Sequence, residues 1–287
     1  MPSPAFHLLR PACRCTSVVF ASPHSGRDYP PEFLRRTVLR GEEVRSSEDA
    51  YVDRLFAAAP DCGAPLLLAG VPRAYVDLNR GADELDPAVI VGARAHGHNP
   101  RIASGLGVVP RVVAGGRAIY RGKIPLDEAH HRITACWHPY HAALAGLVEG
   151  AHAEFGEAIL IDCHSMPHEA VDGIARAGVP RPDVVLGDRF GASAGAEIVD
   201  GVEAAFVAAG LTVVRNTPFA GAYTVQHYGR PACRQHVVQV EIDRSLYMDE
   251  ARLRPRADFA DFAKLMRRVV VDIAAIGAAK PGALAAE

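Results

Sequence analysis

The sequence predicts an α/β protein with a mixed, mainly parallel central sheet and helices on both faces of that sheet. Short, almost wholly apolar segments alternate along the chain with segments of helical periodicity. Strands that are buried on both faces have this composition. Three of the apolar segments also carry His or Glu at or near one end, and they are 17–26, 158–167 and 236–244. Because ligands of such sheets bind beyond the carboxyl ends of the strands, we expect a functional site there.

Composition sets the class of protein and of partner. The 287 residues are 49% hydrophobic and 22% charged, which is enough for one large core. The formal net charge is −2 and no basic stripe is present, so we expect neither a nucleic-acid partner nor a membrane partner. The N-terminus lacks a signal-peptide pattern, and none of the six cysteines forms a CxxC pair. We therefore expect a cytoplasmic protein with a small-molecule partner.

The first half of the chain is expected to begin with an irregular leader over 1–16, before a single α/β domain over 17–275. Strands are expected at 18–22, 65–69, 73–80 and 117–120. A helix is expected over 31–39, because Pro31 suits a first helical turn. Ser46-Ser47-Glu48-Asp49 has the composition of a helix cap with an acidic first turn, and predicts a second helix through Phe56.

The second half contains the clearest helical pattern. From Pro125 onward, apolar residues recur at alternating spacings of three and four, and Pro139 is expected to kink this helix. Further helices are expected over 192–209 and 259–273. Strands are expected at 158–162, 183–187, 211–215 and 236–242. A loop is expected at 81–116, as a lid, a binding loop or a partly disordered segment, and another at 165–182. Residues 216–231 are expected to form a long loop or a hairpin, and a flexible tail is expected at 276–287.

The polar residues near the strand ends suggest a metal-centred hydrolytic site. Such a site takes three ligands from His and carboxylate side chains, keeps one position open, and needs a nearby carboxylate base. His24 and His164 are the candidate histidine ligands, with one acid of the Glu48/Asp49 pair as the third ligand. Glu241 is the candidate base. Each residue also has an ordinary reading, because strand-end histidines are often structural, Glu48 and Asp49 suit a helix cap, and Glu241 suits an Arg partner.

Strand parity supports two of these assignments. In the last strand Glu241 lies opposite the Val240 and Ile242 face, where a carboxylate needs a partner or a function. Asp162 and His164 share one face of their strand. Asp162 is therefore a candidate to orient a metal-binding histidine from behind.

Several blocks resemble the N-formylglutamate amidohydrolase (N-formylglutamate deformylase) family, in order from about residue 17 to 270. They are Ser22-Pro23-His24-Ser25-Gly26, Glu48-Asp49, Val76-Asp77-Leu78-Asn79-Arg80, Asp162-Cys163-His164-Ser165-Met166-Pro167, Leu186-Gly187-Asp188, Asn216-x-Pro218-Phe219 and Gln239-x-Glu241-Ile242. The resemblance implies a zinc-exopeptidase/amidase-like fold with one Zn²⁺ per chain. It matches His24 and His164 to the metal histidines and Glu241 to the catalytic carboxylate. Other members often carry Asp-Thr-Asp-Trp where this chain has Ser47-Glu48-Asp49-Ala50, which selects Asp49 as the third ligand and leaves Glu48 as its alternative.

The implied reaction is hydrolysis of N-formyl-L-glutamate, or of a related N-acyl amino acid, to formate and glutamate, in histidine catabolism. Glu241 would be the base, and Arg80 would help to stabilise the oxyanion. The substrate's two carboxylates call for arginine forks, and Arg80 and Arg73 are the first choices. Asn79 is a further candidate for substrate binding, and His227, Tyr228 and Arg230 are weaker ones. The alternatives are a carboxypeptidase-like or peptidoglycan-amidase-like hydrolase of another N-acyl amino acid or peptide, and a non-catalytic ligand-binding relative.

Overall fold

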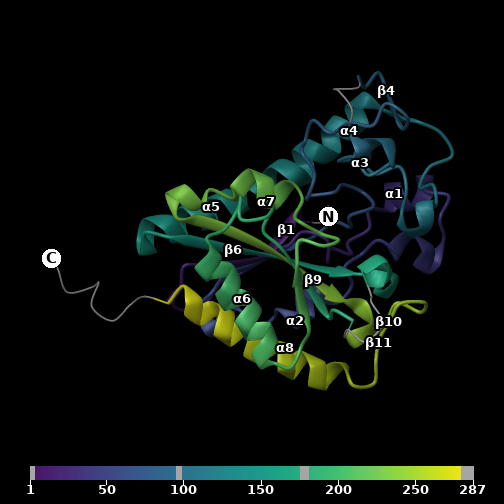
Figure 1. Cartoon of the computed structure of the whole chain (residues 1–287). Helices are drawn as coiled ribbons and strands as arrows, with labels where there is room; N and C mark the ends of the chain where they lie inside the picture. The colour runs from purple at the N-terminus through teal and green to yellow at the C-terminus, as the bar shows by residue number, and fades with distance from the viewer. Residues whose placement is uncertain (1–3, 95–98, 175–180, 279–287) are drawn as a thin grey trace. The chain divides into compact units, whose positions relative to one another are not determined.

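The computed structural model describes residues 4–94, 99–174 and 181–278, and confirms the fold class (Figure 1). A seven-stranded sheet has the order β1-β3-β2-β6-β9-β7-β8. The strands are β1 Phe6–Leu9, β2 Val18–Ser22, β3 Leu66–Ala69, β6 Ala158–Met166, β7 Val184–Gly187, β8 Val213–Arg215 and β9 Gln235–Asp243. β6 pairs in parallel with β2 and β9, and β7 pairs antiparallel with β9. The sheet is therefore mixed and mainly parallel, as expected.

The chain divides into two compact units. The first comprises residues 1–7, 23–50 and 68–143, and the second comprises residues 8–22, 51–67 and 144–287. The prediction of a single domain over 17–275 stays a prediction.

The second unit contains the centre of the sheet, with helices on both sides of it. These helices are α2 Val52–Leu55, α6 Ala196–Ala208, α7 Tyr223–Tyr228 and α8 Phe259–Ile276. α6 and α8 pack against each other on one face, whereas α7 packs against β9 on the other (Figure 1). β6 is buried along all nine of its residues, which explains why its sequence is almost wholly apolar up to Ile161. The polar residues that follow are therefore buried as well.

The first unit is built from short elements around the start of a long helix. They are α1 Pro31–Arg36, α3 Pro100–Ala103, α4 Leu126–Arg132 and the paired strands β4 Ile90–Val91 and β5 Ile124–Pro125. A π-helical turn, Ile133–Trp137, joins α4 to α5 His138–Phe155. This turn lies immediately before Pro139, which has no backbone N–H with which to continue a regular α-helix.

Several local predictions were wrong. The loop predicted over 81–116 contains β4 and α3. The leader contains β1, and residues 117–120 form no strand, since the strand of that region is β5. The 216–231 loop contains α7. Ser46 and Ser47 do not cap a helix, because Tyr51 is left-handed with φ +68° and α2 begins only at Val52. Residues 73–80 form turns despite their alternating pattern, because Asp77 N donates to Val108 O, outside any strand ladder. The expected tail lies outside the described residues from 279 onward.

No helix within the described residues is both long enough and apolar enough to cross a membrane.

We predict that Phe20→Ala destabilises the protein by about 3–5 kcal/mol, because it leaves a cavity in a packed core. Phe20 is fully buried in β2, and its ring centroid lies 5.8 Å from that of Phe56. Urea denaturation followed by circular dichroism measures the change. Phe190 is 79% exposed, so Phe190→Ala is the matched control and should change stability by less than about 0.5 kcal/mol. Equal losses in the two variants would contradict the assignment of Phe20 to the core.

Candidate metal centre

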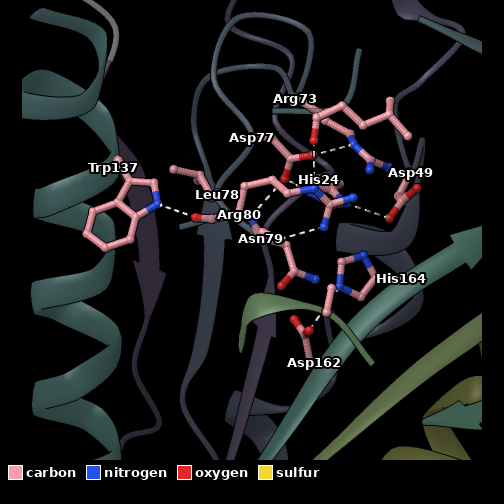
Figure 2. A network of polar contacts seen from close by, with 12 residues as sticks. His24, Asp49, Arg73, Asp77, Leu78, Asn79, Arg80, Trp137, Asp162 and His164 are labelled. Atoms are coloured by element: carbon pink, nitrogen blue, oxygen red, sulfur yellow. Dashed lines mark hydrogen bonds and ion pairs between the residues drawn. The ribbon is translucent and has the colours of Figure 1, made fainter. Parts of the chain in front are cut away.

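His24 follows directly on β2 and is almost completely buried, with 2% of its surface exposed. Its Nε2 lies 2.7 Å from Asp77 Oδ1, and its Nδ1 lies 3.5 Å from Asp49 Oδ2 (Figure 2). Its carbonyl accepts a hydrogen bond of 3.0 Å from the backbone N–H of Asp49. The ring therefore lies between two carboxylates, one of which its own backbone helps to position.

The two acids of the Glu48/Asp49 pair face different partners. Glu48 accepts hydrogen bonds from the Tyr29 hydroxyl at 2.6 Å and from Arg45 Nε and Nη2 at 3.0 and 2.9 Å. Burial, with the charge of Glu48 next, raises the pKa of Tyr29 far above its ordinary value, so this hydroxyl keeps its proton and donates. The carboxylate of Asp49 is directed at His24 instead. This geometry favours Asp49 over Glu48 as a metal ligand.

Asp77 is the partner of His24 that the sequence reasoning missed. Its Oδ1 accepts from His24 and from Asn79 N at 2.9 Å, and its Oδ2 accepts from Arg73 Nε at 3.0 Å (Figure 2). Burial by itself would raise the pKa of Asp77, but the charges of Arg73, His24 and Arg80 outweigh burial and hold that pKa well below its usual range. The signal in the sequence was an acid between the apolar residues Val76 and Leu78, which requires compensation when it is buried.

Arg80 is held by the backbone of its own surroundings. Its Nε donates to Leu106 O and its Nη1 donates to Asn79 O, both at 2.9 Å. The side chain is nearly buried, and this burial lowers the pKa of Arg80 to about 10. Arg80 therefore remains charged at neutral pH, and its guanidinium has a fixed orientation. Arg73, in contrast, uses Nε for Asp77.

In the second unit, β6 presents Asp162 and His164 on the same face, as strand parity predicted. His164 Nε2 lies 3.1 Å from Asp162 Oδ2, and both side chains are buried (Figure 2). The parallel register of β6 and β9 places His164 opposite Glu241. Asp162 thus occupies the place expected of an orienting carboxylate.

Glu241 lies in the middle of β9 and has a partner that the sequence reasoning also missed. Its Oε1 accepts from Gln239 Nε2 at 2.9 Å, and Gln239 Oε1 in turn accepts from Ala222 N at 3.1 Å. Glu241 is 9% exposed. The backbone N–H of Ala222, the residue before α7, thus fixes the Gln239 side chain, and Gln239 in turn fixes one oxygen of the candidate base.

The weaker substrate candidates lie on or beside α7. His227 and Arg230 are exposed, and Arg230 donates to the carbonyl of His227. The His227 ring stacks on that of Tyr223 with centroids 4.9 Å apart, and burial, with Arg230 next, lowers the pKa of His227. Tyr228 is buried. These three residues remain candidates only.

The two imidazoles and their carboxylates are suited to a metal ion. In each unit one ring nitrogen, Nε2, is taken by an aspartate, Asp77 for His24 and Asp162 for His164. Metal-binding histidines commonly use their second nitrogen in this way, which leaves the other to bind the ion. The chemistry of these donors therefore fits a divalent metal ion such as zinc.

Comparison with known proteins identifies relatives of the chain. A sequence model described as N-formylglutamate amidohydrolase matches residues 16–248. N-formylglutamate deformylase of Pseudomonas aeruginosa is 32% identical over 268 residues, covering 89% of this chain and 90% of the relative. N-formylglutamate deformylase of Pseudomonas putida is 34% identical over 220 residues, covering 73% and 74% of the two chains. The crystal structure of N-formylglutamate amidohydrolase from Ralstonia eutropha superposes with a TM-score of 0.88 at 36% identity, covering 95% of this chain and 98% of that one.

We predict that Asp77→Asn lowers the stability of metal-free protein at neutral pH by about 3 kcal/mol, because it leaves Arg73 without its buried partner. The pKa of Asp77 is depressed by folding, so its contribution is fully present above the ordinary carboxyl pKa of about 4 and is lost as pH falls below that value. Urea denaturation between pH 3 and 7, in the presence of chelator, measures this. The difference from wild type should be constant above about pH 5 and shrink below about pH 4. A difference that grows with acidity would contradict it.

Proposed function

The chain belongs to the N-formylglutamate amidohydrolase family, and we propose that it cleaves the N-formyl amide of N-formyl-L-glutamate to give formate and L-glutamate. The extent of the match supports this, since the family match alone covers residues 16–248. Two relatives above 30% identity carry the name N-formylglutamate deformylase. The substrate is a small molecule with two carboxylates, in keeping with a site that contains buried arginine.

The observation that carries the proposal is a group of three buried side chains, His24, Asp49 and His164. Each offers one atom that could bind a metal ion, and within the first unit His24 Nδ1 lies 3.5 Å from Asp49 Oδ2. Two imidazoles and one carboxylate are a typical donor set for catalytic zinc, with a further position left for water or substrate. We propose that they hold one Zn²⁺ per chain, with Asp77 and Asp162 orienting the two rings. A bound zinc ion would supply Lewis-acid polarisation and a lowered pKa for the attacking water.

Glu241 is the proposed general base. It accepts a proton from the attacking water, whose oxygen bonds to the formyl carbon. The C–N bond then breaks, and Glu241 returns the proton to the leaving nitrogen. Formate carries away the oxygen of the water, and glutamate leaves with a free amine. Gln239 keeps one oxygen of Glu241 in place throughout, through the 2.9 Å hydrogen bond.

Arg80 is the proposed anchor for charge on the substrate. Two of its nitrogens donate hydrogen bonds to backbone carbonyls, so the orientation of the guanidinium is fixed. The side chain therefore loses little conformational entropy when an anion binds. Arg80 would also stabilise the oxyanion of the reaction. Arg73 and Asn79 flank it as further contacts for the substrate carboxylates. The expected cytoplasmic location and role in histidine breakdown remain part of this proposal.

We predict that the purified protein releases formate from N-formyl-L-glutamate and that Glu241→Gln lowers kcat by about 10²–10⁴-fold, the usual contribution of a general base. Formate is measured with a coupled dehydrogenase, alongside N-acetyl-L-glutamate and other N-formyl amino acids. The glutamine is nearly isosteric, so zinc content should be unchanged. A fully active E241Q variant would exclude Glu241 as the base, and faster turnover of another acyl amino acid would replace the proposed substrate.

We predict that Asp49→Asn loses most of its bound zinc, whereas Glu48→Gln retains it. The reason is that Glu48 is occupied by Tyr29 and Arg45 while Asp49 faces His24. Metal content per chain is measured by inductively coupled plasma mass spectrometry after dialysis against a weak chelator. The two adjacent, charge-neutralising changes control for each other. Zinc loss from E48Q alone would transfer the ligand role to Glu48.

A further inference from the structure

The segment that carries Asp77, Asn79 and Arg80 has no regular secondary structure, yet it is buried over 74–80. Buried carbonyls outside helices and strands need hydrogen-bond donors from elsewhere. Three of these carbonyls receive one from side chains of the long helical segment 126–155. Arg132 Nη1 donates to Tyr75 O at 3.1 Å, His141 Nε2 to Leu78 O at 2.8 Å, and Trp137 Nε1 to Arg80 O at 2.8 Å. Figure 2 shows Trp137 reaching this segment from the helix.

The three donors share one face of the helix only because of the π turn. In a continuous α-helix, at about 100° per residue, positions five and nine after Arg132 would point about 140° and 180° away from it. The π turn Ile133–Trp137, closed by the bond from His138 N to Ile133 O, takes up one extra residue. Trp137 and His141 then behave as positions four and eight, about 40° and 80° away. The irregularity before Pro139 therefore aligns the donors.

The donors are themselves rigid. All three are buried, and the Arg132 guanidinium lies 4.4 Å from the centroid of the Tyr75 ring and donates to the Tyr120 hydroxyl at 2.6 Å. The rings of Trp137 and His141 lie 4.1 Å apart. His138, three residues before His141, is exposed.

We propose that Arg132, Trp137 and His141 are positioning residues that align Asp77 and Arg80 by binding the carbonyls of Tyr75, Leu78 and Arg80. They do not contact the substrate. They fix the backbone of this segment. The fixed backbone directs the Arg80 guanidinium at the substrate carboxylate and keeps Asp77 Oδ1 within hydrogen-bond distance of His24 Nε2. The expected effect on KM rests on the proposed function, whereas the expected effect on the backbone of this segment does not.

The test compares His141→Phe with His141→Gln. Phenylalanine keeps an aromatic ring next to Trp137 but has no donor, whereas glutamine keeps an N–H donor. Trp137→Phe removes the second donor in the same way. For H141F and W137F we expect KM for N-formyl-L-glutamate to rise about tenfold, the effect of one buried hydrogen bond, with a smaller change in kcat. H141Q should restore most of the loss.

Hydrogen exchange of the peptide spanning residues 75–80, measured by mass spectrometry on each full-length variant, gives a readout that needs no activity. We expect about tenfold faster exchange in H141F and W137F and near wild-type exchange in H141Q. His152→Phe is the matched control, because His152 lies on the same helix and bonds the carbonyl of Cys233 at 2.9 Å. If H141F and W137F lower the melting temperature no more than the control does and leave both KM and exchange unchanged, the proposal is overturned. A wild-type protein inactive on the substrate refutes the proposed function, while exchange still decides this inference.

Discussion

The buried hydrogen bond between Asp77 and His24 is the interaction on which the candidate centre depends. A carboxylate that is almost fully removed from water must be compensated, and here Arg73, the N–H of Asn79 and the His24 ring share that role. Because Asp77 occupies Nε2 of His24, the other ring nitrogen turns towards Asp49. The orientation of a proposed metal ligand is thus decided by a residue that would not touch the metal.

β6 and β9 impose a comparable constraint in the second unit. Their parallel register places His164 opposite Glu241, and side-chain parity puts Asp162 on the face of His164. A slip of one residue would turn each of these side chains to the other face of the sheet. The nine-residue pairing of the two strands, which is buried except at Gln235, prevents such a slip, since it would also remove the aliphatic side chains from their places in the core. Core packing therefore also controls the relative placement of a proposed ligand and the proposed base.

The sequence was a good guide where packing alone decides structure and a poor one where specific hydrogen bonds do. The apolar strands β2, β6 and β9 and the helix α8 were anticipated because burial dictates their composition. The alternation over 73–80 imitated a strand, but the side chain of Asp77 binds Asn79 N and its backbone binds Val108 O. Likewise, Ser46-Ser47-Glu48-Asp49 looked like a helix cap, although Glu48 turns to Tyr29 and Arg45.

The sequence by itself determined the fold class, the family, and the residue types suited to a metal-dependent hydrolase, because these are recorded in local composition and in motif order. Only the tertiary structure decided that Asp49 rather than Glu48 faces His24, that Asp77 and Gln239 support the two candidate functional groups, and that a π turn aligns three donors with one buried segment. The physical reason is that these relations join residues that are far apart in the chain, or depend on helical phase. Neither distance nor phase can be read from the order of residues alone.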